Sequence, residues 1–140
     1  MRESPAKTGA RKPDSARAIL SMLAVIGLIV GHLVLSELRR DARQQTQFLR
    51  AVRANDIDAT RALLNAGMDV NYRYPNLYQS ALHEVAWSGQ TAMARLLLER
   101  GAEPNLANGW TGETPLHAAV RSNPAGMVRL LLDAGANPER

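Results

Sequence analysis

Cysteine is absent from this 140-residue sequence, and aromatic side chains are scarce, with only two Trp, three Tyr and one Phe. Without cysteine the chain can form neither disulfide bonds nor thiolate metal sites, and its redox compartment stays open. Only three histidines are available as metal ligands or as groups that titrate near neutral pH. A chain of this length has room for one small domain and an appendage.

Net charge is lacking from the C-terminal hundred residues. Residues 1–40 carry seven Lys or Arg against three acidic residues, which gives +4, whereas residues 41–140 carry ten of each sign. A nucleic-acid-binding domain concentrates positive charge on its own surface. We therefore expect no nucleic-acid partner, and the basic character of the chain belongs to its N-terminal segment.

Formal charge is also missing from residues 18–35, AILSMLAVIGLIVGHLVL. As an α-helix this stretch is about 27 Å long, close to the hydrocarbon thickness of a bilayer. A cleaved signal peptide has a shorter apolar core with small residues before the cut, a pattern that is missing here. A buried helix of a soluble core rarely goes uncharged for so long. The sequence therefore predicts a transmembrane signal-anchor helix over 18–35.

The segments on either side complete the predicted layout. A basic tail, expected to be disordered, covers 1–17, and a juxtamembrane connector rich in helix formers covers 36–45. Gly27 and Gly31 form a G-x-x-x-G pair, a spacing that permits close approach of two membrane helices. A second copy of the chain is therefore one candidate partner, although small residues are common in membrane helices without such a role.

Positive charge hardly distinguishes the two orientations in a membrane. Five Lys or Arg precede the apolar run, and five follow it within about twenty residues, so the positive-inside rule is nearly tied. The short basic tail ahead of the only span favours an N-terminus on the inside. We predict a single-pass protein of the bacterial inner membrane with its C-terminal domain on the periplasmic side.

The remaining residues, 46–140, repeat with a period of 34 and without a gap. The units cover about 46–79, 80–113 and 114–140. Each starts with a hydroxyl residue suited to cap a helix, continues as a short amphipathic helix and, after a turn, ends with a leucine-rich helix. A glycine follows, where a positive φ stops the helix. The repeated residues are Thr46, Ser80 and Thr114 at the start and Gly67, Gly101 and Gly135 at the end.

The motifs within these units are specific. The third unit opens with TPLHAAV, and the second and third end with LLLERGAEPN and LLLDAGANPE. In these motifs the chain resembles the ankyrin repeat family over about residues 44–140. The resemblance implies an all-α fold, a solenoid of three helix-turn-helix repeats that the transmembrane helix precedes. The residues that match the family's opening signature are Thr114, Pro115, Leu116 and His117, with His83 in the equivalent slot.

The resemblance also implies a protein-binding module without catalytic residues, whose contacts come from loops and from the first helix of each repeat. Tyr, Trp and Arg, the residue types that dominate interface energetics, gather at these positions. The alternative function is an immunity or inhibitor protein that neutralises a toxin or an enzyme. Among the loop rings we expect Tyr78 to pack against its own loop. The predicted partner-binding residues are Trp87, Ser88, Arg53, Arg121, Ser122, Tyr72, Tyr74 and Trp110.

The two ends of the array differ in composition. Polar residues precede the first unit, which suits an N-terminal capping repeat. The last unit has no such polar substitution, so its outer face is exposed or covered by a partner or a second copy. This uncapped C-terminal repeat is a second predicted route to a homo-oligomer.

His83 and Glu84 raise one competing function. In the H-E-x-x-H motif two histidines bind zinc and the glutamate acts as general base, but Trp87 occupies the position of the second ligand. His117 fills the slot of His83 in the next repeat, which favours a structural histidine that hydrogen-bonds locally and to the neighbouring repeat. We therefore expect no catalytic residue, no cofactor and no metal, and keep a metalloenzyme only as a remote alternative.

Overall fold

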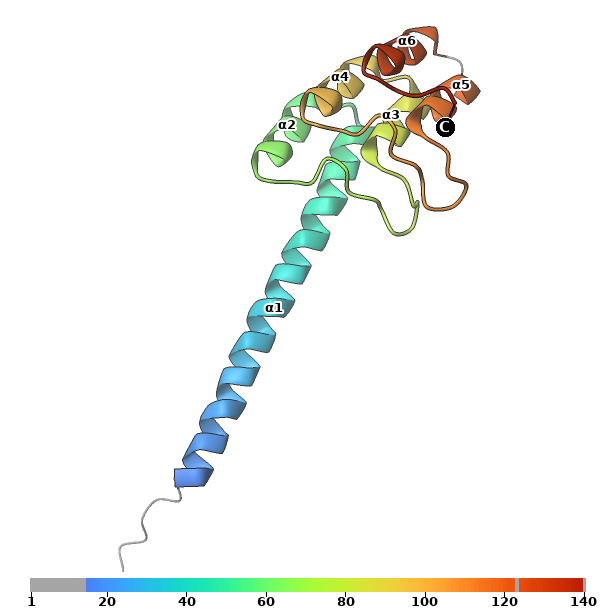
Figure 1. The fold of residues 1–140 in the computed structure, drawn as a ribbon. Helices are drawn as coiled ribbons and strands as arrows, with labels where there is room; N and C mark the ends of the chain where they lie inside the picture. Colours follow the sequence, from blue (N-terminus) through green and yellow to red (C-terminus); the bar gives the residue numbers. More distant parts are fainter. Residues whose placement is uncertain (1–14, 123, 140) are drawn as a thin grey trace, which may run out of the picture. The chain divides into compact units, whose positions relative to one another are not determined.

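The computed structural model describes residues 15–122 and 124–139, which contain six α-helices and no strand (Figure 1). The chain divides into two units, one up to Arg40 and one from Asp41 onward. The predicted all-α fold is confirmed. The helices are α1 (Ser15–Arg53), α2 (Ile57–Asn65), α3 (Ala81–Ser88), α4 (Thr91–Glu99), α5 (Pro115–Ser122) and α6 (Ala125–Asp133).

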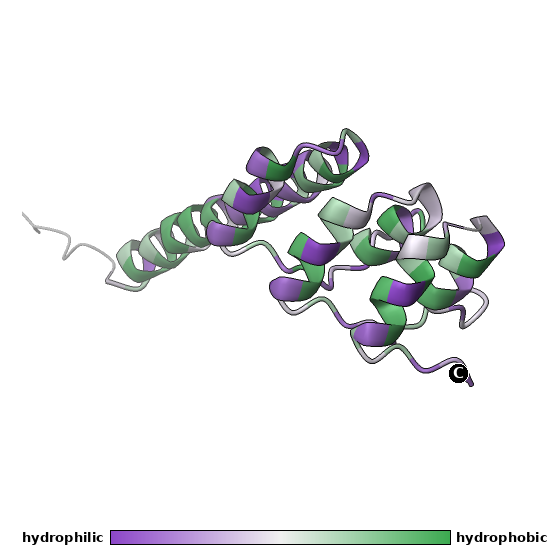
Figure 2. Cartoon of the chain, turned by 90° about the horizontal axis from the view of Figure 1, so that it is seen from above, coloured by the Kyte–Doolittle hydropathy of each residue, from purple (hydrophilic) through white to green (hydrophobic). Residues whose placement is uncertain are grey.

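Helix α1 contains the predicted apolar segment. Every residue from 18 to 35 is exposed, and Figure 2 shows this part of the helix as hydrophobic. By length and composition α1 could cross a membrane. Of the predicted tail, residues 1–14 lie outside the described residues and residues 15–17 begin α1. The predicted connector, 36–45, is helical and also lies within α1.

Residues 41–140 arrange their helices in two layers (Figure 1). The C-terminal part of α1 lies in one layer with α3 and α5, and the other layer holds α2, α4 and α6. The loops that follow α2 and α4 project from the same side. Each predicted repeat is thus one helix pair, with the last turns of α1 as the first helix of the first pair.

The core lies between these layers. Leu82, Val85 and Ala86, the apolar face predicted for the second repeat, are at most 1% exposed. They pack in one cluster with side chains from the other layer, such as Met93 and Leu97 of α4. Because a single helix pair cannot bury both of its faces, the stacking of neighbouring repeats is needed to bury the rest.

The predicted exit glycines have the backbone that the pattern requires. Gly67, Gly101 and Gly135 have φ values of +94°, +87° and +89°. In this left-handed region a Cβ clashes with the backbone, whereas glycine, which has no Cβ, adopts it without steric cost. The prediction that these residues stop the second helix of each repeat is confirmed.

Asn71 and Asn105 occupy the same position in successive repeats, and each connects the segment after the second helix of its repeat to the same segment of the next repeat. Asn71 Nδ2 donates to the carbonyl oxygen of Gly101 (3.1 Å), and its Oδ1 accepts from the N–H of Glu103 (2.8 Å). Thirty-four residues on, Asn105 bonds Gly135 O at 2.9 Å and Asn137 N at 2.7 Å in the same way. One amide side chain therefore satisfies two backbone groups of the next repeat.

Thr46 is not a helix cap, and that prediction is wrong. Ser80 is the N-cap residue of α3 and Thr114 directly precedes α5, but α1 runs through position 46 without a break. The amides that a cap would serve are therefore already inside a helix. The Thr46 hydroxyl instead donates to the carbonyl oxygen of Ala42 at 2.9 Å.

Candidate protein-binding surface

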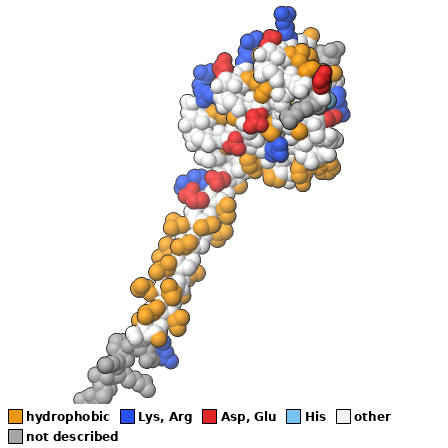
Figure 3. Space-filling view, viewed as in Figure 1, with side chains coloured by type: hydrophobic (Ala, Val, Ile, Leu, Met, Phe, Trp, Pro, Cys, Tyr) orange, Lys and Arg blue, Asp and Glu red, His pale blue; other side chains and the backbone are white. Residues whose placement is uncertain are grey.

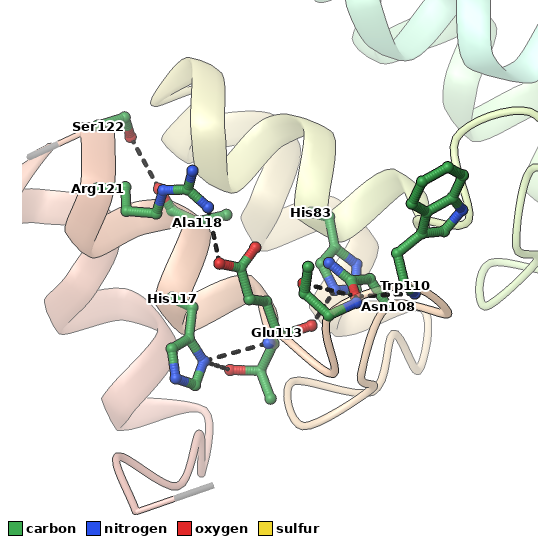
Figure 4. A network of polar contacts seen from close by, with 10 residues as sticks. His83, Asn108, Trp110, Glu113, His117, Ala118, Arg121 and Ser122 are labelled. Carbon is green, nitrogen blue, oxygen red and sulfur yellow. Dashed lines mark hydrogen bonds and ion pairs between the residues drawn. The ribbon is translucent and has the colours of Figure 1, made fainter.

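The signature histidine of the second repeat ties the first residue of that repeat to its last through both of its ring nitrogens. His83 Nδ1 accepts from the N–H of Ser80 at 3.2 Å and lies 2.9 Å from the Ser80 hydroxyl. Its Nε2 lies 3.1 Å from the carbonyl oxygen of Glu113 (Figure 4). Because a carbonyl only accepts, the network assigns the proton to Nε2. Burial lowers the pKa of His83, which keeps the ring neutral.

Glu84 is held by a cation from the first repeat. Its carboxylate accepts from Arg53 Nε at 2.9 Å and from Arg53 Nη2 at 3.3 Å. The hydrogen bond to Glu84 is the main reason that the pKa of Arg53 is raised. The two residues that suggest a zinc-protease helix are thus both used structurally, His83 within its own repeat and Glu84 in a contact with the first repeat.

The predicted residues on the first helices form a row. Arg53, Trp87 and Arg121 occupy the same slot of three successive repeats, and all three side chains are exposed. The Arg121 guanidinium lies 5.8 Å from the centre of the Trp87 ring, within range of a cation–π contact. Figure 4 shows the same guanidinium beside the carboxylate of Glu113, 2.7 Å away. We call Arg53, Trp87 and Arg121 the inner row.

The two predicted serines lie next to the inner row and are largely used within their own helices. Ser88 is exposed, and its hydroxyl donates to the carbonyl oxygen of Glu84 at 3.0 Å. Ser122 is half-buried, and its hydroxyl bonds Ala118 O at 3.2 Å. Both serines therefore border the row without offering a free hydroxyl proton.

The loop aromatics form two separate pairs instead of one cluster. Tyr72 and Tyr74 meet edge to face with ring centres 5.2 Å apart, and Tyr78 and Trp110 meet at 5.4 Å. Tyr74 is only 7% exposed, and burial raises its pKa. Within the described residues its hydroxyl finds no hydrogen-bond partner. Tyr78 and Trp110 are instead 45% and 76% exposed.

This arrangement reverses one expectation for the loops. Tyr74, expected on the contact surface, belongs to the core, and Tyr78, expected to pack against its own loop, shows much of its ring to solvent. The slot explains the difference, because Asn108, the counterpart of Tyr74 in the next repeat, is buried as well. The sequence carried no signal for this, because the burial of the slot shared by Tyr74 and Asn108 appears only in the structure.

A cavity of about 610 Å³ brings three of the predicted residues together. Arg53, Tyr72 and Tyr74 line it, along with Leu49 of α1 and Leu77 of the first loop. Trp110 lies apart from this cavity, on the tip of the second loop. The predicted residues thus fall into the inner row with its serines, the Tyr72–Tyr74 pair and the exposed Trp110.

Stacked helix pairs, each with a histidine near its start and joined to the next by a repeated asparagine, define a helical-repeat protein. The family model of ankyrin repeats (3 copies) matches residues 20–108 and 48–140, and the chain belongs to the ankyrin repeat family. Domains of this family are typically non-catalytic modules that bind other proteins. No curated protein is a significant match to the chain.

Proposed function

We propose that this protein is a membrane-tethered, non-catalytic interaction module that captures another protein on its inner row. In this proposal residues 18–35 cross the membrane, residues 36–45 connect, and the repeats over 46–140 bind the partner. The domain lies on the periplasmic side of a bacterial inner membrane.

The tether is supported by the surface of α1. A soluble helix buries one face, but the apolar segment of α1 has no buried residue from 18 to 35. Eighteen uncharged residues left in water would expose an apolar surface far beyond the patches that monomeric proteins tolerate. A bilayer is the solvent that suits such a helix.

The observation that carries the binding proposal is Trp87, an indole that is 56% exposed on a helix whose other face is core. Arg53 and Arg121 flank it in the repeat register, and each is already oriented by a carboxylate, Glu84 or Glu113. Aromatic and Arg side chains held in fixed positions lose little conformational entropy on binding, which favours affinity.

The experiment is photo-crosslinking of the full chain in native membranes, with the reactive group next to position 87 and captured proteins identified by mass spectrometry. We expect Trp87→Ala to abolish capture while the thermal midpoint of the domain hardly changes. The lost cation–π contact with Arg121 is worth only about 0.5–1 kcal/mol at an exposed site. Tyr74 is left intact, because its ring is part of the core.

Leu132→Ala is the matched control, since Leu132 is also a partly exposed apolar residue (43%) but lies on α6 in the other layer. It should capture the partner as the unmodified chain does. Equal capture by Trp87→Ala and Leu132→Ala would refute the inner row as the binding site. With the reactive group moved next to Gly27 or Gly31, a crosslink between two copies of the chain would instead show a homo-oligomer.

A further inference from the structure

The tips of the loops that follow α2 and α4, residues 74–79 and 106–112, form one ordered unit. Tyr74 ties the first tip, since its carbonyl oxygen accepts from the N–H groups of Leu77 (3.0 Å) and Tyr78 (2.6 Å). Asn108 ties the second tip, where its Oδ1 accepts from Thr111 N at 2.8 Å. Both anchoring side chains are buried, which leaves the residues between them at the surface.

The two tips are also joined to each other. The N–H of Gly109 donates to the carbonyl oxygen of Tyr78 at 2.9 Å. A Cβ placed on Gly109 would lie only 3.0 Å from Tyr78 Cδ1, so the backbone of one loop touches the ring of the other. The Trp110 ring then packs edge to face on Tyr78. These contacts present the two rings in a fixed arrangement.

Tyr78 holds its position against the preference of its backbone. Its φ is +52°, in the left-handed region that disfavours side chains other than glycine. The same slot of the next repeat is Gly112, with φ +72°. Burial compensates for this only in part, because nearly half of the Tyr78 side chain is exposed. A strained residue whose side chain stays at the surface points to a role outside the fold.

The chemistry of the tips is that of a bilayer interface. Residues 74–79 and 106–112 contain no charged side chain. Leu77, Tyr78 and Trp110 are their exposed large apolar residues, and Figure 3 shows hydrophobic side chains gathered on the loop side of the repeat domain. Tyr and Trp rings, each with one polar atom, are the residues that concentrate at the boundary between acyl chains and headgroups.

We propose that Leu77, Tyr78 and Trp110 form a lipid-docking patch that inserts into the interface of the bilayer to which α1 tethers the chain. The inference rests on the proposed tether, because a tethered domain meets the bilayer at a high effective concentration and needs only modest affinity for it. A phospholipid surface is thus the occupant of this patch, whereas the inner row is left free for a protein.

Single-tryptophan variants of the full chain test the patch in nanodiscs whose lipids carry bromine near the headgroup end of the acyl chains, with a second set brominated near the chain ends at the depth of Leu28. Trp87→Phe leaves Trp110 as the only indole, and Trp110→Phe leaves Trp87. Leu28→Trp in a chain without the other two indoles reports whether α1 is in the bilayer. We expect bromine to cause loss of emission from Trp110 and from the Leu28→Trp probe, but not from Trp87.

Tyr78→Gly is a variant that should retain the fold, because glycine readily adopts the left-handed backbone conformation at position 78. It should reduce the quenching of Trp110 without lowering the thermal midpoint. A lower midpoint with unchanged quenching would show that the ring serves the fold, and would overturn the assignment.

The outcomes separate the patch from the tether. Quenching of the Leu28→Trp probe without quenching of Trp110 would overturn the patch and leave the tether standing. Loss of protein capture by Trp110→Ser, together with unquenched Trp110, would assign the tips to a protein partner instead. No quenching at Leu28→Trp would refute the tether and the docking patch together.

Discussion

At the scale of single residues, burial decides what the signature histidine can do. His83 is 2% exposed, and the causes that act on its pKa are burial and Arg73, which lower it, and the carbonyl and carboxylate of Glu113, which raise it. Burial is the largest of these, so the neutral ring is the folded form. Protonation would also place a second N–H against the N–H of Ser80, to which Nδ1 is now the acceptor.

His83 should therefore make the repeat domain sensitive to mild acid. Since its folded pKa lies below the unfolded value of about 6.5, the unfolded chain binds more protons there. The contribution of neutral His83 to the free energy of unfolding is fully present above pH 6.5. It is lost as the pH falls below that value, by at most about 1.4 kcal/mol per pH unit. Denaturation of the full chain in detergent, followed by tryptophan fluorescence between pH 8 and pH 5, measures this slope.

His83→Gln should flatten that slope, whatever it does to stability at pH 8. His117→Gln is the matched control, because His117 makes the equivalent contacts to Thr114 through Nδ1, but its Nε2 has no hydrogen bond among the described residues. It should retain the loss in acid. An unchanged slope in His83→Gln would contradict the assignment.

At this scale the sequence could predict features that the repeat pattern determines, but not features that depend on tertiary packing. The positive φ of Gly101 and the slot of His83 follow from the repeat register, and both could be predicted from it. The exposure of Tyr74 and Tyr78 could not be predicted from composition, because it depends on which ring turns toward α1. The partner-binding roles of the inner row stay predictions, since exposure alone does not identify a ligand.

At the scale of elements, the period of 34 predicted the helix pairs, because equivalent residues of each repeat pack against equivalent residues of the adjacent repeat. It failed at Thr46, where the preceding apolar segment continues the helix and removes the free amides that a cap serves. The stacking of pairs is held at the exits by Asn71 and Asn105. In the next equivalent slot stands Glu139, whose carboxylate cannot donate a hydrogen bond as an amide does.

The asparagine bridges should contribute measurably to the stacking of repeats. Asn71→Ala and Asn105→Ala each leave a carbonyl oxygen and an N–H of the next repeat without their protein partner, so we expect a loss of about 1–3 kcal/mol in unfolding free energy. Asn76→Ala is the control at an exposed loop position and should stay within about 0.5 kcal/mol. Urea denaturation compares the three variants, and a loss in Asn76→Ala equal to the other two would count against the bridges.

At the scale of the whole molecule, the charge separates into a basic N-terminal segment and a neutral repeat domain. The proposed orientation depends on a near tie between the cations before the span and those after it, among them Arg39 and Arg40. Arg40 is exposed and pairs with Glu37 at 3.3 Å, but acidic residues contribute little to orientation. A few charges should therefore decide on which side the repeats, and with them the inner row, are found.

Changing those charges should shift the orientation in opposite directions. Each Lys or Arg near an anionic leaflet is worth about 1 kcal/mol. Replacing Arg39 and Arg40 by Gln should therefore strengthen the proposed orientation, whereas replacing Arg11 and Lys12 by Gln should invert part of the population. A reporter that is active only outside the cytoplasm, fused after Arg140, measures the distribution, and one that is active only in the cytoplasm gives the complement. Cytoplasmic activity with the unmodified chain would place the inner row on the cytoplasmic side, so its partner would have to be sought there.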